Sequence, residues 1–425
     1  MSNILRKTYN HFSLINKSAY FVSCTQACQD LEGFLSPREV EKMVRVGIIG
    51  QGYVASIFAI GLERIKLGEL NYYGVPLANE LPIKIEDIQI VTSYDVDKSK
   101  IGLPLSEVVK RYWEGHIPES LQEIYVKKGI HLRSLRNLPI EASGLEDEMP
   151  LKEAVEQLVS EWKDAKVEVI LNVPTTESFV PFEKLENLEK AIKEDNRDRL
   201  TATQVYAYAA AQYAKEVGGA AFVNAIPTSI ANDPAFVELA KESNLVIFGD
   251  DGATGATPLT ADILGHLAQR NRHVLDIAQF NIGGNNDFLA LTDKDRNKSK
   301  ESTKSSIVED ILGYDAPHYI KPTGYLEPLG DKKFIAMHIE YISFNGARDE
   351  LVVTGRINDS PALAGLLVDL ARLGKIAIDR KEFGTVYPVN AFYMKNPGPK
   401  DARNIPRIIA YEKLREWVGL PPRYL

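Results

Sequence analysis

The stretch that decides the fold is VRVGIIGQGYVASIFAIGLERI, residues 44–65. Residues 44–49 are a short β-branched run, as a buried parallel strand requires. Gly50, Gly52 and Ala55 follow as G-x-G-x-x-A, and residues 56–65 carry apolar side chains at helical spacing. A strand, a tight glycine turn and a helix place bare backbone amides at a helix N-terminus, where a pyrophosphate is stabilised. The motif alone is weak, because an ordinary strand-to-helix turn has the same pattern.

A second strand is predicted at residues 88–94, and it ends in Asp95, with Asp97 two residues later. An acid at this place prefers the free ribose hydroxyls of NAD and repels the 2′-phosphate of NADP. Asp95 lies 45 residues after Gly50, whereas the simple fingerprint expects about 20. We therefore interpret residues 66–82, which contain Gly and Pro, as an insertion. A surface turn is the alternative role for either aspartate.

Further strands alternate with helices downstream. Residues 167–175, 220–228 and 244–257 each read as an apolar strand followed by polar residues, and the Ala-rich stretch 200–218 reads as a helix. Apolar strands with polar carboxyl ends are typical of a doubly wound α/β sheet, whose ligand crevice lies at those ends. The sequence therefore favours the oxidoreductase class, with a dinucleotide cofactor.

The composition excludes several classes of function. The chain has 425 residues and a formal net charge of −8, and without a dominant basic stripe it is not expected to bind nucleic acid. No apolar run approaches the roughly 20 residues of a membrane span. Two cysteines, Cys24 and Cys28, cannot build a disulfide framework, so we expect a cytoplasmic protein. Residues 1–42 show no sustained period and are interpreted as an N-terminal extension whose order the sequence does not decide.

One segment is unusual for an acidic protein. In NDFLALTDKDRNKSKESTKSS, residues 286–306, five cations stand between positions 294 and 304. A solvated surface loop is the ordinary explanation of such a charge run. A pocket for an anionic ligand is the alternative.

Four motifs in order carry a resemblance to a known family: VNAIPTSIANDP (223–234), GDDGATGAT (249–257), FNIGGNNDF (280–288) and KSKESTKSS (298–306). From about residue 44 to 420 the chain resembles the myo-inositol-1-phosphate synthases, also called inositol-3-phosphate synthases, and most of all their shorter prokaryotic members. Longer eukaryotic members carry a histidine where Ile282 stands and a glycine where Phe288 stands. Those departures concern the local shape of the pocket.

The resemblance implies an NAD-binding Rossmann domain over residues 43–280, completed by 390–425. It also implies an inserted α+β domain over 281–389 that forms the catalytic site and the interface of a homotetramer. Residues 334–359 fit an antiparallel pair of strands in that insertion. Residues 360–380 read as an amphipathic helix, which we expect to pack on the inserted sheet.

The implied reaction converts D-glucose 6-phosphate to 1D-myo-inositol 3-phosphate, for inositol and phospholipid biosynthesis. NAD oxidises C5, the C6 proton is removed, the enolate attacks the C1 aldehyde, and NADH reduces the C5 ketone. Negative charge develops on oxygen throughout, and it calls for fixed cations in a site that excludes water. The sequence predicts no metal site. A divalent ion stays possible because family members differ, but a calcium or magnesium site needs about six oxygens, more than GGNND supplies.

The resemblance assigns the lysines. Lys300 and Lys304, at i and i+4, would share one face of a helix and bind the phosphate or enolate, while Lys294 and Lys298 are left to solvent. For Lys333 the neighbour Lys332 is a register alternative, and Lys400 is a weaker candidate. The predicted catalytic residues are Lys300, Lys304, Lys333, Lys395, Asp251, Asn281 and Asp369.

Two further points complete the predicted site. The alternative for Asp369 is a helix-face acid paired with Arg372 at i+3. The predicted cofactor residues are Gly50, Gly52, Tyr53, Val54, Asp95, Asn172, Thr175, Tyr206 and Asp250.

Two other functions compete with the synthase. An NAD-dependent sugar-phosphate dehydrogenase would share the cofactor domain but transfer hydride with net redox change, and it would not need the set of lysines. A non-catalytic NAD-binding regulator would be favoured if the lysines were missing, and all four matching positions are present.

Overall fold

The computed structural model describes residues 43–132 and 134–424, apart from the side chains of 298–306. The predicted extension, residues 1–42, therefore lies outside the described residues. Both sheets of the protein belong to the unit Val44–Leu425. No helix in the described part of the chain is long and apolar enough to cross a membrane.

A seven-stranded sheet, parallel throughout, has the strand order β11-β6-β5-β4-β1-β2-β3. Its strands are β1 (Val44–Ile49), β2 (Ile88–Asp95), β3 (Val126–Lys128), β4 (Val169–Asn172), β5 (Ala220–Asn224), β6 (Leu245–Phe248) and β11 (Gly384–Thr385). The chain runs from β1 outward to β3, then returns to β4 on the other side of β1. This reversal confirms the predicted doubly wound fold, and it opens a crevice at the carboxyl ends of β1 and β4.

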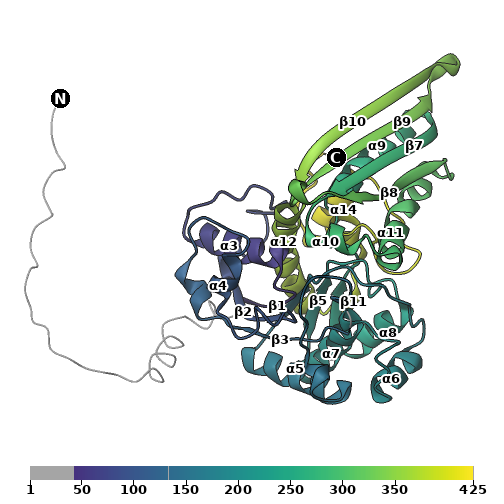
Figure 1. The fold of residues 1–425 in the computed structure, drawn as a ribbon. Coiled ribbons are helices and arrows are strands. Elements are labelled where there is room, and N and C mark those ends of the chain that lie inside the picture. Colours follow the sequence, from purple (N-terminus) through teal and green to yellow (C-terminus); the bar gives the residue numbers. More distant parts are fainter. Residues whose placement is uncertain (1–42, 133, 425) are drawn as a thin grey trace, which may run out of the picture. The chain divides into compact units, whose positions relative to one another are not determined.

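Helices cover both faces of this sheet (Figure 1). One face packs against α3 (Tyr53–Lys66), α4 (Leu105–Val109) and α12 (Asp359–Asp379), and the other against α5 (Leu151–Ala165), α6 (Leu185–Lys193), α7 (Ala202–Val217) and α8 (Pro234–Glu242). The helix predicted at 200–218 is α7. It begins at a Thr201–Gln204 capping box and ends at Gly218, whose φ is +88°, because only glycine takes that conformation without strain.

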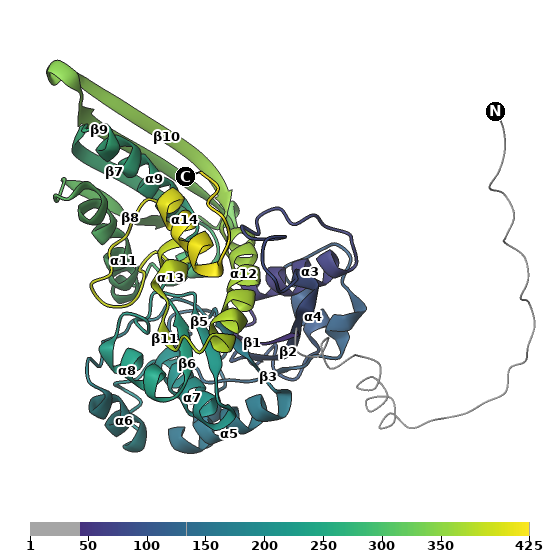
Figure 2. The same ribbon diagram turned by 180° about the vertical axis from the view of Figure 1, so that it is seen from behind.

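A second, four-stranded sheet has the order β10-β9-β7-β8. Its strands are β7 (His273–Gly283), β8 (His318–Tyr325), β9 (Lys332–Ile342) and β10 (Arg348–Asn358). The antiparallel pair predicted for residues 334–359 is confirmed as β9 and β10. Helices α9 (Ala256–Gln269) and α11 (Lys294–Leu312) cover one face (Figure 2), and the short α10 (Asn286–Ala290) follows β7.

The helix predicted at 360–380 exists as α12, but its predicted packing is wrong. It lies on the parallel sheet, in one apolar cluster with β1, β4 and β5. Gly374 permits the close approach, because a Cβ there would lie 3.0 Å from Ala221 and 3.1 Å from Val169. The second sheet thus begins with β7 at His273, before the predicted boundary at 281, and α12 packs on the parallel sheet although it lies within the predicted insertion. The chain then ends with α13 (Tyr387–Tyr393) and α14 (Arg407–Val418).

Candidate active site

The glycine turn after β1 passes close to the segment after β4 and leaves the start of α3 open. Gly50 has a φ of +89°, and a Cβ there would lie 2.7 Å from the backbone nitrogen of Pro174, just after β4. Gly52 is the N-cap of α3 without a side-chain hydrogen bond, and a Cβ on Gly52 would meet nothing within 4 Å. The first amides of α3 are thus open to a ligand, and the positive end of the helix dipole favours an anionic one.

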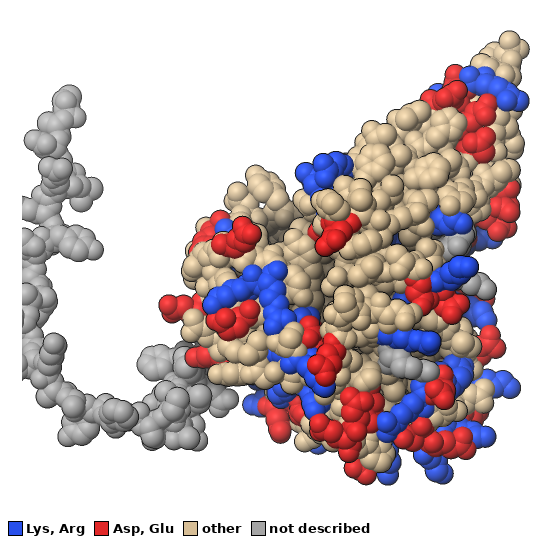
Figure 3. Space-filling view, in the orientation of Figure 1, with Lys and Arg blue, Asp and Glu red and all other residues tan. Residues whose placement is uncertain are grey.

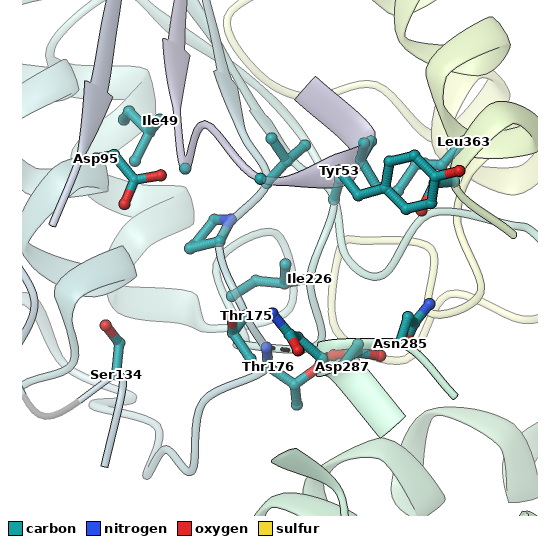
Figure 4. A pocket seen from close by; sticks show the side chains of 18 of the residues that line it. Ile49, Tyr53, Asp95, Ser134, Thr175, Thr176, Ile226, Asn285, Asp287 and Leu363 are labelled. Carbon is teal, nitrogen blue, oxygen red and sulfur yellow. Dashed lines mark hydrogen bonds between the residues drawn. The ribbon is translucent and has the colours of Figure 1, made fainter. Parts of the chain in front are cut away.

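A cavity of about 380 Å³ lies at this turn (Figure 4). Segments at the carboxyl ends of β1, β2, β4 and β5 form part of its wall, and α10 and the first turn of α12 form another part. Its size falls in the range of small-molecule sites. Seven of the predicted cofactor residues line it: Gly50, Gly52, Tyr53, Val54, Asp95, Thr175 and Tyr206.

Asp95 ends β2 at the cavity, as predicted, but a cation accompanies it. Its Oδ1 accepts hydrogen bonds from the backbone N–H groups of Val96 (2.7 Å) and Asp97 (2.9 Å). Its Oδ2 lies 3.0 Å from Nζ of Lys100. Lys100 also lines the cavity and is buried. Sequence reasoning missed this lysine, although it stands only five residues after Asp95.

Two buried lysines pair with carboxylates where the cavity adjoins a smaller compartment. Lys395 Nζ lies 3.0 Å from Asp251 Oδ1, and Lys333 Nζ lies 3.1 Å from Asp359 Oδ1. Lys395, Asp251 and Asp359 line the main cavity, while Lys333, Lys395 and Asp359 line the smaller compartment. The structure therefore brings together four of the predicted catalytic residues: Lys333, Lys395 and Asp251, and also Asn281, which lines the smaller compartment.

The register at Lys333 follows from strand geometry. Successive residues of a strand point to opposite faces of the sheet, and Lys332 is exposed where Lys333 is buried. A Cβ on Gly255 would lie 2.5 Å from Lys333 Nζ, so the absent side chain there leaves room for the ammonium. Of the two alternatives, Lys333 is the one that faces the site.

Asp331 joins three segments around these lysines. Its carboxylate accepts hydrogen bonds from Asn285 Nδ2 (3.0 Å), from the backbone N–H of Ser360 (2.9 Å) and from the Ser360 hydroxyl (2.6 Å). Asp287 connects the same region to the parallel sheet, because its Oδ1 accepts a hydrogen bond from the Thr176 hydroxyl at 2.7 Å. All these contacts hold α10, β9 and α12 at one wall of the cavity.

The two departures from the family pattern differ in effect. Phe288 is buried and lines the smaller compartment, with its ring 5.6 Å from Lys333 Nζ, so it shapes the surroundings of that lysine. Ile282 lines neither cavity. Asn281, predicted as catalytic, lines only the smaller compartment, and its Nδ2 donates to the carbonyl of Lys321 at 3.1 Å.

Two predicted cofactor residues do not reach the cavity. Asn172 is fully buried, and its Nδ2 donates to Thr203 Oγ1 (3.2 Å) and Asn224 Oδ1 (3.0 Å). Asp250 is also buried and accepts hydrogen bonds from the backbone N–H groups of residues 230–232. Burial raises the pKa of Asp250 to about 6, although these hydrogen bonds oppose the shift. The side chains of Asn172 and Asp250 point away from the cavity and hold neighbouring loops in place.

Asp369, predicted as catalytic, lies outside both cavities. It is fully buried in the middle of α12 and pairs with Arg372, the partner that the alternative interpretation gave it. Asp369 Oδ2 also accepts hydrogen bonds from Tyr393 (2.7 Å) and from the backbone N–H of Leu77 (2.8 Å). Arg372 donates to carbonyls of the predicted insertion after α3, at Leu77 and Ala78. The pair thus anchors that insertion to α12.

The cation-rich segment forms most of α11, so its backbone is helical as assumed for Lys300 and Lys304. The side chains of Lys298, Lys300 and Lys304 lie outside the described residues, and their roles stay predictions. Arg296 is buried and donates to the carbonyls of Thr176 (3.1 Å) and Arg136 (2.9 Å). Lys294 and Lys400 are exposed.

Among the polar residues of the main cavity wall that sequence reasoning missed are Lys100, Asn285, Asp287, Asp331 and Asp359. A usable signal existed for three of them. Asn285 and Asp287 belong to GGNND, and Asp359 begins a helix directly after a strand, the junction that brings side chains to a sheet edge. Among the described residues, no group of three or more His, Cys, Asp or Glu side chains is arranged to hold a metal ion.

Known proteins resemble this chain in sequence and fold. The family model described as myo-inositol-1-phosphate synthase matches residues 255–360. A crystal structure of a myo-inositol-1-phosphate synthase-related protein from Thermotoga maritima is 72% identical, with a TM-score of 0.86, over 90% of this chain and 100% of that one. The inositol-3-phosphate synthase of Mycobacterium tuberculosis is 28% identical over 398 residues, 89% of this chain and 97% of the relative.

A more distant structure shares the fold. Inositol-3-phosphate synthase from Caenorhabditis elegans is 18% identical, with a TM-score of 0.74, over 90% of this chain and 86% of that one. The Thermotoga relative carries the assignment, because its identity of 72% extends over its whole length. The chain belongs to the myo-inositol-1-phosphate synthase family.

Proposed function

We propose that the protein converts D-glucose 6-phosphate to 1D-myo-inositol 3-phosphate, with an NAD that is regenerated in each turnover. The observation that carries the proposal is the presence of two buried lysine–carboxylate pairs, Lys395–Asp251 and Lys333–Asp359, beside the glycine-turn cavity. The curated relatives named inositol-3-phosphate synthase support the same reaction.

The described residues fit NAD. The open amides after Gly52 would hold the pyrophosphate, and Asp95 stands where an adenine ribose is held in this fold. Glycine at position 50 lets the turn pass close to the segment after β4, because a Cβ there would lie 2.7 Å from the backbone nitrogen of Pro174. When bound, NAD supplies the acceptor for the C5 hydride and, once reduced, the hydride that restores the C5 alcohol.

The two buried lysines, Lys333 and Lys395, can stabilise the negative charge that develops on the substrate. The enolate and the C1 alkoxide both carry negative charge on oxygen, and the phosphate is anionic throughout. Lys333 and Lys395 hold ammonium groups inside the protein, and their carboxylate partners fix them before the substrate arrives. Cations that are already oriented in a site shielded from water stabilise such charge without reorganisation, each by roughly 10²–10³ in rate.

The test is product formation beside the redox state of the cofactor. Purified protein with glucose 6-phosphate and a trace of NAD⁺ is expected to form inositol phosphate over many turnovers while NADH stays far below the product. NADH that rises in step with substrate loss, without a cyclic product, would favour the dehydrogenase. Binding of NAD⁺ without any reaction would favour the regulator.

We also propose a homotetramer that forms through the uncovered face of the four-stranded sheet, meaning the face on which none of the described helices packs. That face carries exposed apolar side chains, including Phe280 (44% exposed), Tyr319 (43%) and Val352 (69%). Figure 3 shows the middle of the same face largely free of charged side chains, which gather at its far end, with one basic patch at its near end. Large exposed apolar patches mark interaction surfaces, and a second copy of the chain is the partner that the family resemblance implies.

A further inference from the structure

The acid that faces the ribose has a buried cation beside it. Lys100 Nζ lies 3.0 Å from Asp95 Oδ2 and 3.8 Å from Asp97 Oδ2. Only 8% of the Lys100 side chain is exposed, and the residue lines the main cavity together with both aspartates. The ring of Tyr112, which also lines the cavity, has its centroid 5.9 Å from the same ammonium.

The local backbone fixes this lysine. Lys100 donates its backbone N–H to the carbonyl of Asp97 at 2.9 Å, and Asp97 Oδ1 accepts from both the N–H (2.9 Å) and the hydroxyl (2.6 Å) of Ser99. Burial alone would lower the pKa of Lys100, but the carboxylates of Asp95 and Asp97 raise it, so the ammonium stays charged. Lys98 in the same turn is half exposed and pairs with Glu141.

This arrangement changes the expected cofactor discrimination. An unpaired acid at the end of the second strand rejects a 2′-phosphate by repulsion. Here Asp95 and Asp97 carry two negative charges. Lys100 offsets one of them, and Arg111, whose Nη1 lies 3.9 Å from Asp97 Oδ2, partly offsets the other. The other cation among the described residues of the main cavity wall, Lys395, is paired with Asp251. Charges in partly buried surroundings interact several times more strongly than in water.

We infer that Lys100 is a specificity-determining residue of the cofactor site: its ammonium offsets Asp95 and lets the site accept a dinucleotide with a 2′-phosphate as well as NAD. The inference rests on the proposed function, because it assumes that the cavity binds a nicotinamide dinucleotide. The wild type then binds NADP⁺ measurably, although the acid alone predicts rejection.

The experiment measures dissociation constants of NAD⁺ and NADP⁺ by calorimetry for the full-length protein and three variants. Lys100→Met keeps most of the stem without the charge, and it is expected to weaken NADP⁺ binding about tenfold or more while NAD⁺ changes less than about threefold. Lys100→Arg is expected to retain NADP⁺ binding. Lys98→Met, two residues earlier, is expected to change neither constant. Higher salt should weaken NADP⁺ binding to the wild type more than to Lys100→Met.

Equal loss of both dinucleotides in Lys100→Met would overturn the inference, because it would show that Lys100 only holds Asp95 in place. A wild type that binds NAD⁺ but no measurable NADP⁺ would overturn it as well, while the proposed function would stand. A wild type that binds neither dinucleotide would overturn both.

Discussion

At the scale of single residues, identical neighbours have different environments because the backbone turns them apart. Lys333 is buried beside Asp359, and Lys332 on the same strand is exposed. Asp251, with a φ of +63°, reaches Lys395 at the cavity, whereas Asp250 is enclosed by backbone amides. Neighbouring residues of the chain thus point in different directions. Asp251 can contact a ligand in the cavity, whereas Asp250 holds a loop in place.

The pair of lysines gives a matched test. Lys333→Met is expected to lower the rate of inositol phosphate formation by about 10²–10³, because a developing oxyanion loses an oriented cation. Lys332→Met removes the same charge one residue earlier and is expected to stay within about twofold, as surface substitutions usually do. Steady-state kinetics of both variants, with NAD⁺ affinity as the check on folding, distinguishes them. Equal losses would remove the assignment of Lys333 to the site.

At the scale of elements, α12 serves the site and the core at once. Its first turn contributes Asp359 and Ser360 to the cavity wall, and its C-terminal half packs on the parallel sheet at Gly374. Between these, Asp369 and Arg372 hold the insertion that follows α3. The position of this part of the cavity wall therefore depends on how α12 packs on the parallel sheet.

Breaking the buried Asp369–Arg372 pair on α12 is expected to destabilise the protein without changing its affinity for the cofactor. Asp369→Asn leaves Arg372 as an uncompensated buried charge, and the free energy of unfolding should fall by about 3–5 kcal/mol. Asp379→Asn on the same helix disrupts the ion pair with Lys375. Because 54% of the Asp379 side chain is exposed, this substitution should lower the free energy of unfolding by less than about 1 kcal/mol. Urea denaturation at one protein concentration compares them. A direct role of Asp369 in catalysis would instead appear as lost turnover at unchanged stability.

At the scale of the whole molecule, the cavity is built by both sheet systems. Strand ends of the parallel sheet supply Gly50, Asp95 and Thr175, and the inserted unit supplies Asn285 and Asp331. No helix among the described residues covers the second face of the inserted sheet, and we propose the contact between copies there. Assembly and catalysis then share one structural unit.

A charge on the uncovered face is expected to disrupt the assembly. Phe280→Glu places a carboxylate among the exposed apolar side chains of β7, and its desolvation should oppose association. Leu259→Glu on α9 is the matched control, since Leu259 is 40% exposed on a helix that covers the opposite face. Light scattering after size-exclusion chromatography reports the mass of each. A Phe280→Glu variant that keeps the mass of the wild type would refute this interface.

The sequence by itself determined the features that depend on neighbours along the chain. The strand, glycine turn and helix at 44–65, the alternation of strands and helices, and the pairing of β9 with β10 all follow from local periodicity and turn residues. The ordered motifs also determined the family. Lys333 and Lys395 came from that resemblance, and the described structure places both at the site.

Only the tertiary structure decided which polar groups face the cavity and which sheet α12 covers. An amphipathic helix presents the same apolar stripe to either sheet, so its pattern does not choose between them. Asp359 and Asp369 stand ten residues apart on that helix, about 15 Å along its axis, and only the first lies at the cavity. The position of Lys100 beside Asp95 likewise depends on the conformation of the turn after β2. Contacts between segments distant in sequence decide the packing of α12 and the place of Asp359, whereas the Lys100–Asp95 pair depends on the conformation of one turn, which residue types alone do not specify.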